Sequence, residues 1–269
     1  MNWSSFSLNG LALAVAETGI GRPMLFQHGL CGLAAQTAEV FPDDIGWRCL
    51  TLECRGHGRS EAGPVEAFSL ATFADDLAAF IAARHLAPVV LGGISMGAAL
   101  SIRLAVKRPE LVRALVLARP AWLAEAGPEN LQPNIAVGEL LADLAPAEAL
   151  RRFDASPLAH RLAAEAPDNL ATLRALFTRE PAAVTSALLT RISTDGPGVT
   201  EAELARLTLP TLVIGTGNDA IHPLPMARRL AAAIPDARFI EITPKGVDRA
   251  AYVGDFSAAL AGFLKELAP

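Results

Sequence analysis

The segment from Val89 to Leu100 reads Val-Val-Leu-Gly-Gly-Ile-Ser-Met-Gly-Ala-Ala-Leu, and it joins two different patterns. A short apolar run of strand-forming residues comes first, and an alanine-rich pattern typical of a helix follows. Between them lies the G-x-S-x-G sequence from Gly93 to Gly97, whose glycines permit a sharp turn and a close approach of helix to strand. This context predicts that Ser95 is a nucleophile at the carboxyl end of a parallel sheet. The N–H of Met96 would then face a developing oxyanion. The alternative, a glycine-rich turn with an incidental serine, fits the flanking patterns less well.

The composition indicates one large α/β unit with a substantial core. The chain has 269 residues, of which 52% are hydrophobic and 19% charged. Its formal net charge is −5 and it has no basic run, so neither nucleic acid nor an anionic membrane is expected as a partner. The first residues lack the basic and apolar regions of a signal peptide. The three cysteines, Cys31, Cys49 and Cys54, are odd in number and lack metal-ligand spacing. We therefore expect a cytoplasmic protein with free thiols and no metal site.

Strand and helix patterns alternate through most of the chain. Alternating apolar residues over 3–17 surround Asn9-Gly10, which predicts a β-hairpin. Further strands are expected at 24–26, 47–52, 89–94, 114–117, 211–214 and 237–242, and helices at 69–85, 96–108, 224–234 and 252–267. Strands that alternate with helices of this length indicate parallel βαβ units.

The region from 121 to 206 differs from the rest. It contains only alanine- and leucine-rich helical segments that are interrupted by prolines, and no convincing buried strand. A helical insertion between two strands of one sheet is typical of a lid. We therefore predict a core formed by 1–120 and 207–269, with a helical cap at 121–206.

Four motifs, in this order along the chain, resemble those of the α/β-hydrolase superfamily. They are His28-Gly29-Leu30, the turn from Glu53 to Ser60 with Glu in place of the usual Asp, the elbow at Ser95, and the loop from Gly217 to Pro223. The resemblance covers essentially the whole chain. It implies an α/β fold with a mostly parallel eight-stranded sheet, flanking helices and an inserted helical cap. It also implies a serine hydrolase without a cofactor, in which Asp219 is the triad acid and Leu30 supplies the second oxyanion N–H beside Met96.

The sequence departs from this family in one respect. The family carries its catalytic histidine in the loop after the last strand, where this chain has Gly246-Val247, and no histidine follows His222. His222, three residues after Asp219, is the candidate for a relocated base, because a base must reach the serine. The alternative is that His222 packs at or caps the start of a helix. Lys245 and Asp248 are further candidate bases, with solvated loop charges as the alternative.

Two residues are candidates for contact with a substrate. Arg119 follows the strand before the cap and would lie near the site, where a guanidinium could receive an anionic group. His28 belongs to the loop that would form the oxyanion hole, although its ring could equally support the backbone. The arginines of the cap are more simply explained as solvated helix faces.

Three functions are compatible with these residues. The first is a serine hydrolase that acts on a small carboxylic ester, lactone or thioester. The second is a ligand-binding protein on a hydrolase scaffold that lacks a competent base. The third is a non-hydrolytic, lyase-like reaction that uses the oxyanion hole to stabilise a carbanion. The elbow, the oxyanion loop and the acid position are all present, which favours the hydrolase with a small-molecule substrate. The patterns leave monomer and homodimer undecided.

Overall fold

The computed structural model describes residues 1–267, and the last two residues of the expected core lie outside this part. Eight strands form one sheet in the order β1-β2-β4-β3-β5-β6-β7-β8. All neighbours from β4 to β8 are parallel, whereas β2 pairs antiparallel with both β1 and β4. The mostly parallel eight-stranded sheet expected from the sequence is therefore confirmed. The strands are β1 Asn2–Leu8, β2 Leu11–Gly19, β3 Arg22–Gln27, β4 Trp47–Leu52, β5 Val89–Ile94, β6 Val112–Ala118, β7 Thr211–Thr216 and β8 Arg238–Ile242.

Helices cover both faces of this sheet and bury two apolar clusters. On one face lie α2 (Leu70–Ala83), α3 (Met96–Lys107) and α10 (Leu224–Ala233). On the other face lie α1 (Ala34–Val40) and α11 (Arg249–Glu266). The parallel strands are almost continuously apolar because both of their faces are buried. Within residues 1–267, no helix is both long enough and apolar enough to cross a bilayer.

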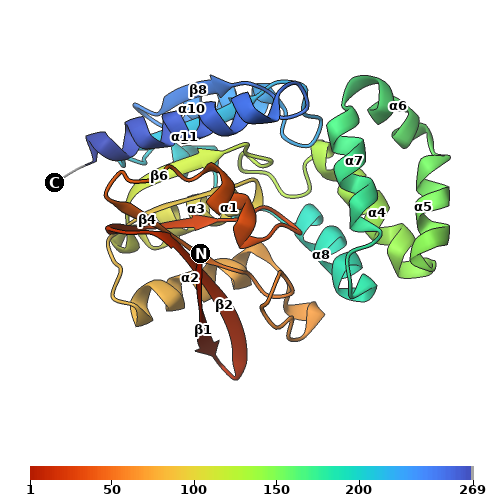
Figure 1. Cartoon of the computed structure of the whole chain (residues 1–269), viewed down its shortest axis with the longest axis horizontal. Coiled ribbons are helices and arrows are strands. Elements are labelled where there is room, and N and C mark those ends of the chain that lie inside the picture. Colours follow the sequence, from red (N-terminus) through yellow and green to blue (C-terminus); the bar gives the residue numbers. More distant parts are fainter. Residues whose placement is uncertain (268–269) are drawn as a thin grey trace.

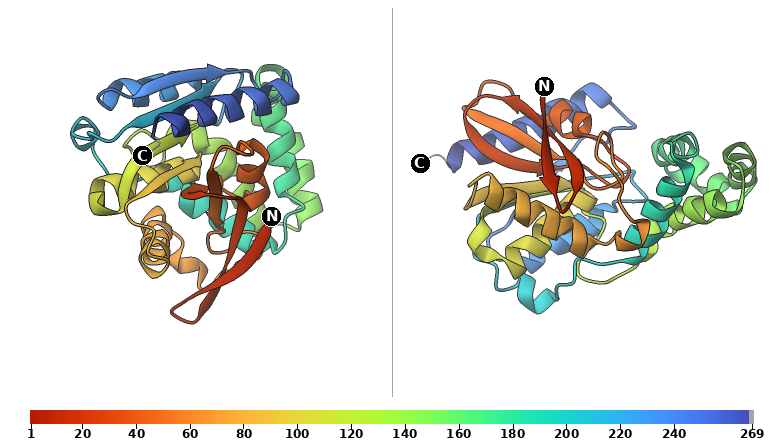
Figure 2. Two further views of the ribbon diagram at one scale, coloured as in Figure 1. Left: turned by 60° about the vertical axis from the view of Figure 1, so that its left-hand side comes forward. Right: turned by 90° about the horizontal axis from the view of Figure 1, so that it is seen from below.

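The first two strands form the hairpin that the sequence predicts. Leu8 pairs with Leu11, and the two residues between them, Asn9 and Gly10, have φ of 50° and 84°. These left-handed conformations are those of the two-residue turn that matches the twist of a hairpin. The hairpin projects from the body of the molecule beside the N-terminus (Figure 2).

Between β6 and β7 the chain is helical, as the sequence pattern predicts. Three of these helices begin at a proline in the first turn, where its missing N–H costs nothing. The helices α4 to α8 form a lobe beside one end of the sheet (Figure 1) and enclose an apolar cluster of their own. They are α4 Gln132–Asp143, α5 Pro146–Asp154, α6 Pro157–Glu165, α7 Pro167–Leu176 and α8 Ala182–Thr194, and the short α9 Glu201–Leu204 follows. The bounds of a separate cap domain remain a prediction.

The glycines of the elbow are required by close packing between strand and helix. A Cβ on Gly93 would lie 2.4 Å from the carbonyl carbon of Gly97, and one on Gly97 would lie 2.5 Å from the carbonyl oxygen of Gln27. These neighbours are backbone atoms of buried elements and cannot move aside as a flexible side chain can. The two glycines therefore let α3 begin directly against β3 and β5.

Substitution of Gly97 tests this packing. We expect Gly97→Ala to lower the free energy of unfolding by about 3 kcal/mol, because overpacking forces the backbone of α3 or β3 to shift. The control is Gly254→Ala on the exposed side of α11, where an added Cβ meets no atom within 4 Å. There we expect a gain of up to about 1 kcal/mol from helix propensity. Urea denaturation measures both values, and equal effects would contradict the packing argument.

Candidate active site

Ser95 occupies the turn between β5 and α3 in a strained conformation. Its φ of 56° and ψ of −109° are rare for a residue with a side chain, and its N–H donates to the carbonyl of Ala118 at 2.9 Å. The turn presents the side chain to a cavity while only 7% of the residue is exposed. Strain of this kind persists only where the surrounding structure fixes it, and it is concentrated at functional sites.

The cavity lies between the carboxyl ends of the strands and the helical lobe. It has a volume of about 130 Å³. A space of this size holds a small molecule, since a cavity of about 150 Å³ accommodates benzene. On the side of the lobe, its wall combines Leu173, Leu176 and Leu189 with the polar residues Asn134, Asp168, Asn169 and Thr172. The polar groups that line it beside Ser95 include Arg119, Asn169, His222 and Lys245.

Two backbone N–H groups flank Ser95. Met96 is the first residue of α3, so its N–H has no acceptor within the helix. Leu30 lies in the loop after β3 and lines the cavity. Within residues 1–267, the structure shows no hydrogen bond from either N–H group. Both are therefore available to an oxygen bound at Ser95, as an oxyanion hole requires.

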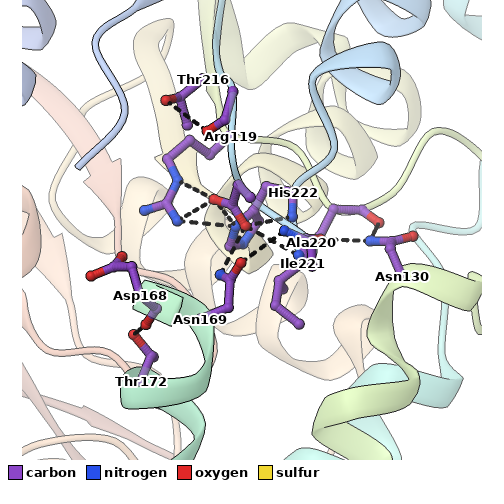
Figure 3. Close-up of polar contacts among 12 residues, drawn as sticks. Arg119, Asn130, Asp168, Asn169, Thr172, Thr216, Ala220, Ile221 and His222 are labelled. Atoms are coloured by element: carbon purple, nitrogen blue, oxygen red, sulfur yellow. Dashed lines mark hydrogen bonds and ion pairs between the residues drawn. The ribbon is translucent and has the colours of Figure 1, made fainter. Parts of the chain in front are cut away.

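The carboxylate of Asp219 is the centre of a hydrogen-bond network. Figure 3 shows the polar contacts of this region, with its partners Arg119, Asn169 and His222 labelled. Its Oδ2 accepts from the guanidinium of Arg119 at 2.5 and 3.1 Å and lies 2.9 Å from Nδ1 of His222. Its Oδ1 accepts from the side-chain amide of Asn169 at 3.0 Å and from the backbone N–H groups of Ile221 and His222. Burial opposes ionisation, but the ring of His222 and the charge of Arg119 hold the pKa of Asp219 well below its usual range.

His222 lines the same cavity as Ser95 and is held by Asp219. Burial lowers the pKa of its imidazole; the Asp219 carboxylate opposes this shift, and the Arg119 charge adds to it. His222 is therefore neutral near pH 7, the state in which a base can accept a proton. Nη2 of Arg119 also lies 3.1 Å from its Nδ1. A guanidinium only donates, so this contact favours the tautomer with the proton on Nε2, whereas donation to Asp219 requires the proton on Nδ1.

Arg119 follows β6 and is largely buried, with φ of 45°. Burial alone would lower its pKa, but Asp219 raises it, so the guanidinium stays charged. Its ionic partner is Asp219, which the family resemblance identifies as the acid that pairs with the catalytic histidine. Arg119 thus neutralises Asp219, which leaves less charge to stabilise an imidazolium at His222.

The remaining candidate residues lie in different surroundings. Lys245 reaches the cavity wall. Asp248 caps the exposed first turn of α11, where its side chain accepts from the N–H of Ala251 at 3.0 Å. Val247 is 66% exposed. Within residues 1–267, the cavity lining does not include His28, which is fully buried with both ring nitrogens bonded to backbone groups.

Asn169 is a member of this network that the sequence analysis did not single out. It lies in α7, 50 positions before Asp219, and its carbonyl oxygen also accepts from the N–H of Ala220 at 2.8 Å. The nitrogen and the oxygen of the Asn169 side-chain amide therefore both bind the loop that contains Asp219, and they attach this loop to the helical lobe. An asparagine in a helical pattern gives no sign of such a role. In the part of the chain that the structure describes, no three His, Cys, Asp or Glu side chains are grouped to hold a metal ion.

The buried histidines predict a loss of stability in mild acid. Burial lowers the pKa of His28, His57 and His222 below the ordinary value of 6.5, so the folded state stays neutral where the unfolded state gains protons. Each such group removes about 1.4 kcal/mol of stability per pH unit below that value. Between about pH 7.5 and 5.5 we expect a loss of up to about 4 kcal/mol.

Urea unfolding across this range measures the effect. Asp219 does not contribute to this loss of stability, because a carboxylate with a lowered pKa loses its stabilising effect only below its ordinary pKa of 3.8. The exposed His160, replaced in His160→Gln, is the control and should leave the slope unchanged. A stability that is flat between these two pH values would contradict neutral burial of the three rings.

Replacement of Arg119 tests the electrostatic coupling. Because the Arg119 charge lowers the pKa of His222, we expect Arg119→Met to raise that pKa, which an NMR titration of the ring can follow. The matched control is Arg228→Met on the exposed side of α10, whose guanidinium pairs with Glu241. A His222 pKa that stays constant or falls in Arg119→Met would refute the coupling.

Comparison with known proteins agrees with this architecture. A sequence model described as the alpha/beta hydrolase fold matches residues 22–246. The chain is 29% identical over 248 residues to "Putative non-heme bromoperoxidase BpoC" of Mycobacterium tuberculosis, which covers 87% of this chain and 90% of that protein. It is 26% identical to the AB hydrolase superfamily protein YisY of Bacillus subtilis, with 88% of each chain covered. The enol-lactonase from Burkholderia xenovorans has a similar fold, with a TM-score of 0.72, 21% identity and coverage of 97% and 100%.

Proposed function

The chain belongs to the alpha/beta hydrolase fold family, and from this premise we propose that it hydrolyses small carboxylic esters, lactones or thioesters through Ser95. One observation carries the proposal: the strained serine and an aspartate-bound histidine, His222, line the same small cavity. A serine hydroxyl is a weak nucleophile until a nearby base takes its proton. His222 supplies this base from the loop after β7, in place of the histidine that the loop after β8 lacks.

The proton relay follows from the hydrogen bonds of His222. In the tautomer with the proton on Nδ1, the ring donates to Oδ2 of Asp219, and Nε2 is free to accept the proton of Ser95. The serine oxygen then attacks the carbonyl carbon of the substrate. The oxyanion receives hydrogen bonds from the N–H groups of Leu30 and Met96. The imidazolium returns its proton to the leaving alcohol or thiol, and water releases the acyl group by the same steps.

The shape of the cavity supports a small substrate with an apolar acyl group. The leucines of α7 and α8 offer an apolar patch for an acyl group, with Asn134, Asp168 and Thr172 of the lobe beside it and further polar groups near Ser95. In this proposal the helical segment acts as a lid, because its residues complete the cavity from above the strand ends. Exclusion of water by such a lid strengthens every hydrogen bond to the oxyanion.

A second candidate is a ligand-binding protein that uses the same cavity without turnover. The observation in its favour is that Arg119 already neutralises Asp219. A carboxylate with a permanent cationic partner stabilises an imidazolium less than a free carboxylate does. The cavity, the serine and the two N–H groups would then recognise a ligand rather than a transition state.

Labelling with a fluorophosphonate at about pH 8 separates the two candidates. We expect a covalent adduct on Ser95, none in Ser95→Ala, and a labelling rate at least about 100-fold lower in His222→Ala, because a general base contributes this much. The control is His160→Ala, which removes an exposed histidine of α6 and should label like the unmodified protein.

Each contrary result has a definite meaning. A folded protein whose Ser95 stays unlabelled would favour the ligand-binding candidate. Full labelling of His222→Ala would mean that the base is another residue. The variants Lys245→Met and Asp248→Asn would then identify it.

A further inference from the structure

Two neighbouring buried histidines beside the site have no part in the proton relay. The rings of His28 and His57 lie 4.7 Å apart between their centroids, and both residues are fully buried. His28 is the first residue after β3, and His57 lies in the turn from Glu53 to Ser60 that follows β4. Burial of two imidazoles is costly unless their nitrogens are hydrogen-bonded.

His28 and the backbone N–H of Gly32 together determine the direction of one peptide group, since the Gly29 carbonyl oxygen accepts from both, from Gly32 at 2.9 Å. Its Nδ1 donates to the carbonyl oxygen of Gly29 at 2.8 Å, and its Nε2 accepts from the N–H of Cys54 at 3.1 Å. The Gly29 carbonyl and the Leu30 N–H belong to the same planar trans peptide, so they point in opposite directions. Because the carbonyl points toward the buried ring, the Leu30 N–H points away from it, on the side where Gly29 and Leu30 line the cavity.

The bonds of His57 fix the next peptide group. Its Nδ1 donates to the carbonyl of Arg55 at 2.9 Å, which leaves Nε2 to accept from the N–H of Cys31 at 2.9 Å. Cys31 has φ of 56°, a conformation that needs support from its surroundings. Burial, together with the neighbouring His28 and Arg179, lowers the pKa of His57 well below its usual value and preserves the acceptor nitrogen.

We propose that His28 and His57 are positioning residues, which hold the Leu30 N–H in the direction in which it stabilises an oxyanion on Ser95. The inference rests on the proposed hydrolytic function and adds to it. His28 acts through the Gly29 carbonyl and His57 through the Cys31 N–H. The two residues therefore need opposite nitrogens: Nδ1 as a donor in His28 and Nε2 as an acceptor in His57.

This difference gives a crossed test with matched variants. The amide of asparagine replaces the position of Nδ1, and the amide of glutamine replaces that of Nε2. We expect His28→Asn and His57→Gln to keep the rate of Ser95 labelling within about 3-fold, because the bond to the loop survives. We expect His28→Gln and His57→Asn to lower it by about 10- to 100-fold, with KM for a p-nitrophenyl ester unchanged.

The crossed pattern distinguishes positioning from general destabilisation. All four variants lose ring packing, so their melting temperatures fall whichever amide is introduced, and the rates are compared where urea unfolding shows each variant to be folded. The exposed His160 provides the controls His160→Asn and His160→Gln. Labelling rates that follow melting temperature, or asparagine and glutamine variants with equal rates at each position, would overturn the proposal.

Failure of the proposed function gives a different result. If the unmodified protein does not label, hydrolysis through Ser95 fails, and hydrogen exchange of the Cys31 amide decides whether the loop is held. Protection that is kept in His57→Gln and lost in His57→Asn supports the held loop. Equal loss of protection in both variants refutes it.

Discussion

The carboxylate of Asp219 accepts hydrogen bonds from three separate parts of the chain, and the geometry of the site depends on it. Arg119 reaches it from the end of β6, Asn169 from helix α7, and His222 from the same loop. A buried charge is stable only when it is paired and its oxygens are fully hydrogen-bonded. This requirement draws the helical lobe, the carboxyl end of β6 and the loop after β7 together around one group.

Arg119 has two opposing consequences at this carboxylate. Its charge keeps Asp219 ionised in a buried position, so that the acid can orient the ring of His222. The same charge lowers the pKa of His222 and reduces the stabilisation of an imidazolium. The balance between these effects separates a hydrolase with a modest base from a protein that only binds its ligand.

The oxyanion hole that we propose lies outside this network. It depends on the strained turn at Ser95 and on neutral, buried imidazoles rather than on charged groups. Absence of a histidine from the loop after β8 therefore leaves the elbow and the Leu30 loop intact. Glu53 supports the same region, because its carboxylate accepts from the N–H groups of Ala34 and Arg59. Glu53 has a longer side chain than the aspartate that is usual in this motif. It fits because a Cβ on Gly58 would clash with its carboxylate, and glycine has none.

The sequence alone predicts the local features: the hairpin at Asn9-Gly10, the elbow at Ser95 and the alternation that gives a parallel sheet. These depend on backbone conformations and apolar periods that neighbouring residues set. It did not predict α1, a seven-residue helix without a side-chain cap whose first N–H is bonded by the distant Glu53. That Arg119 and Asn169 share Asp219, across separations of 100 and 50 positions, follows only from the packing of the fold. A buried charge pairs with the groups that packing brings to it, and no local pattern records which groups those are.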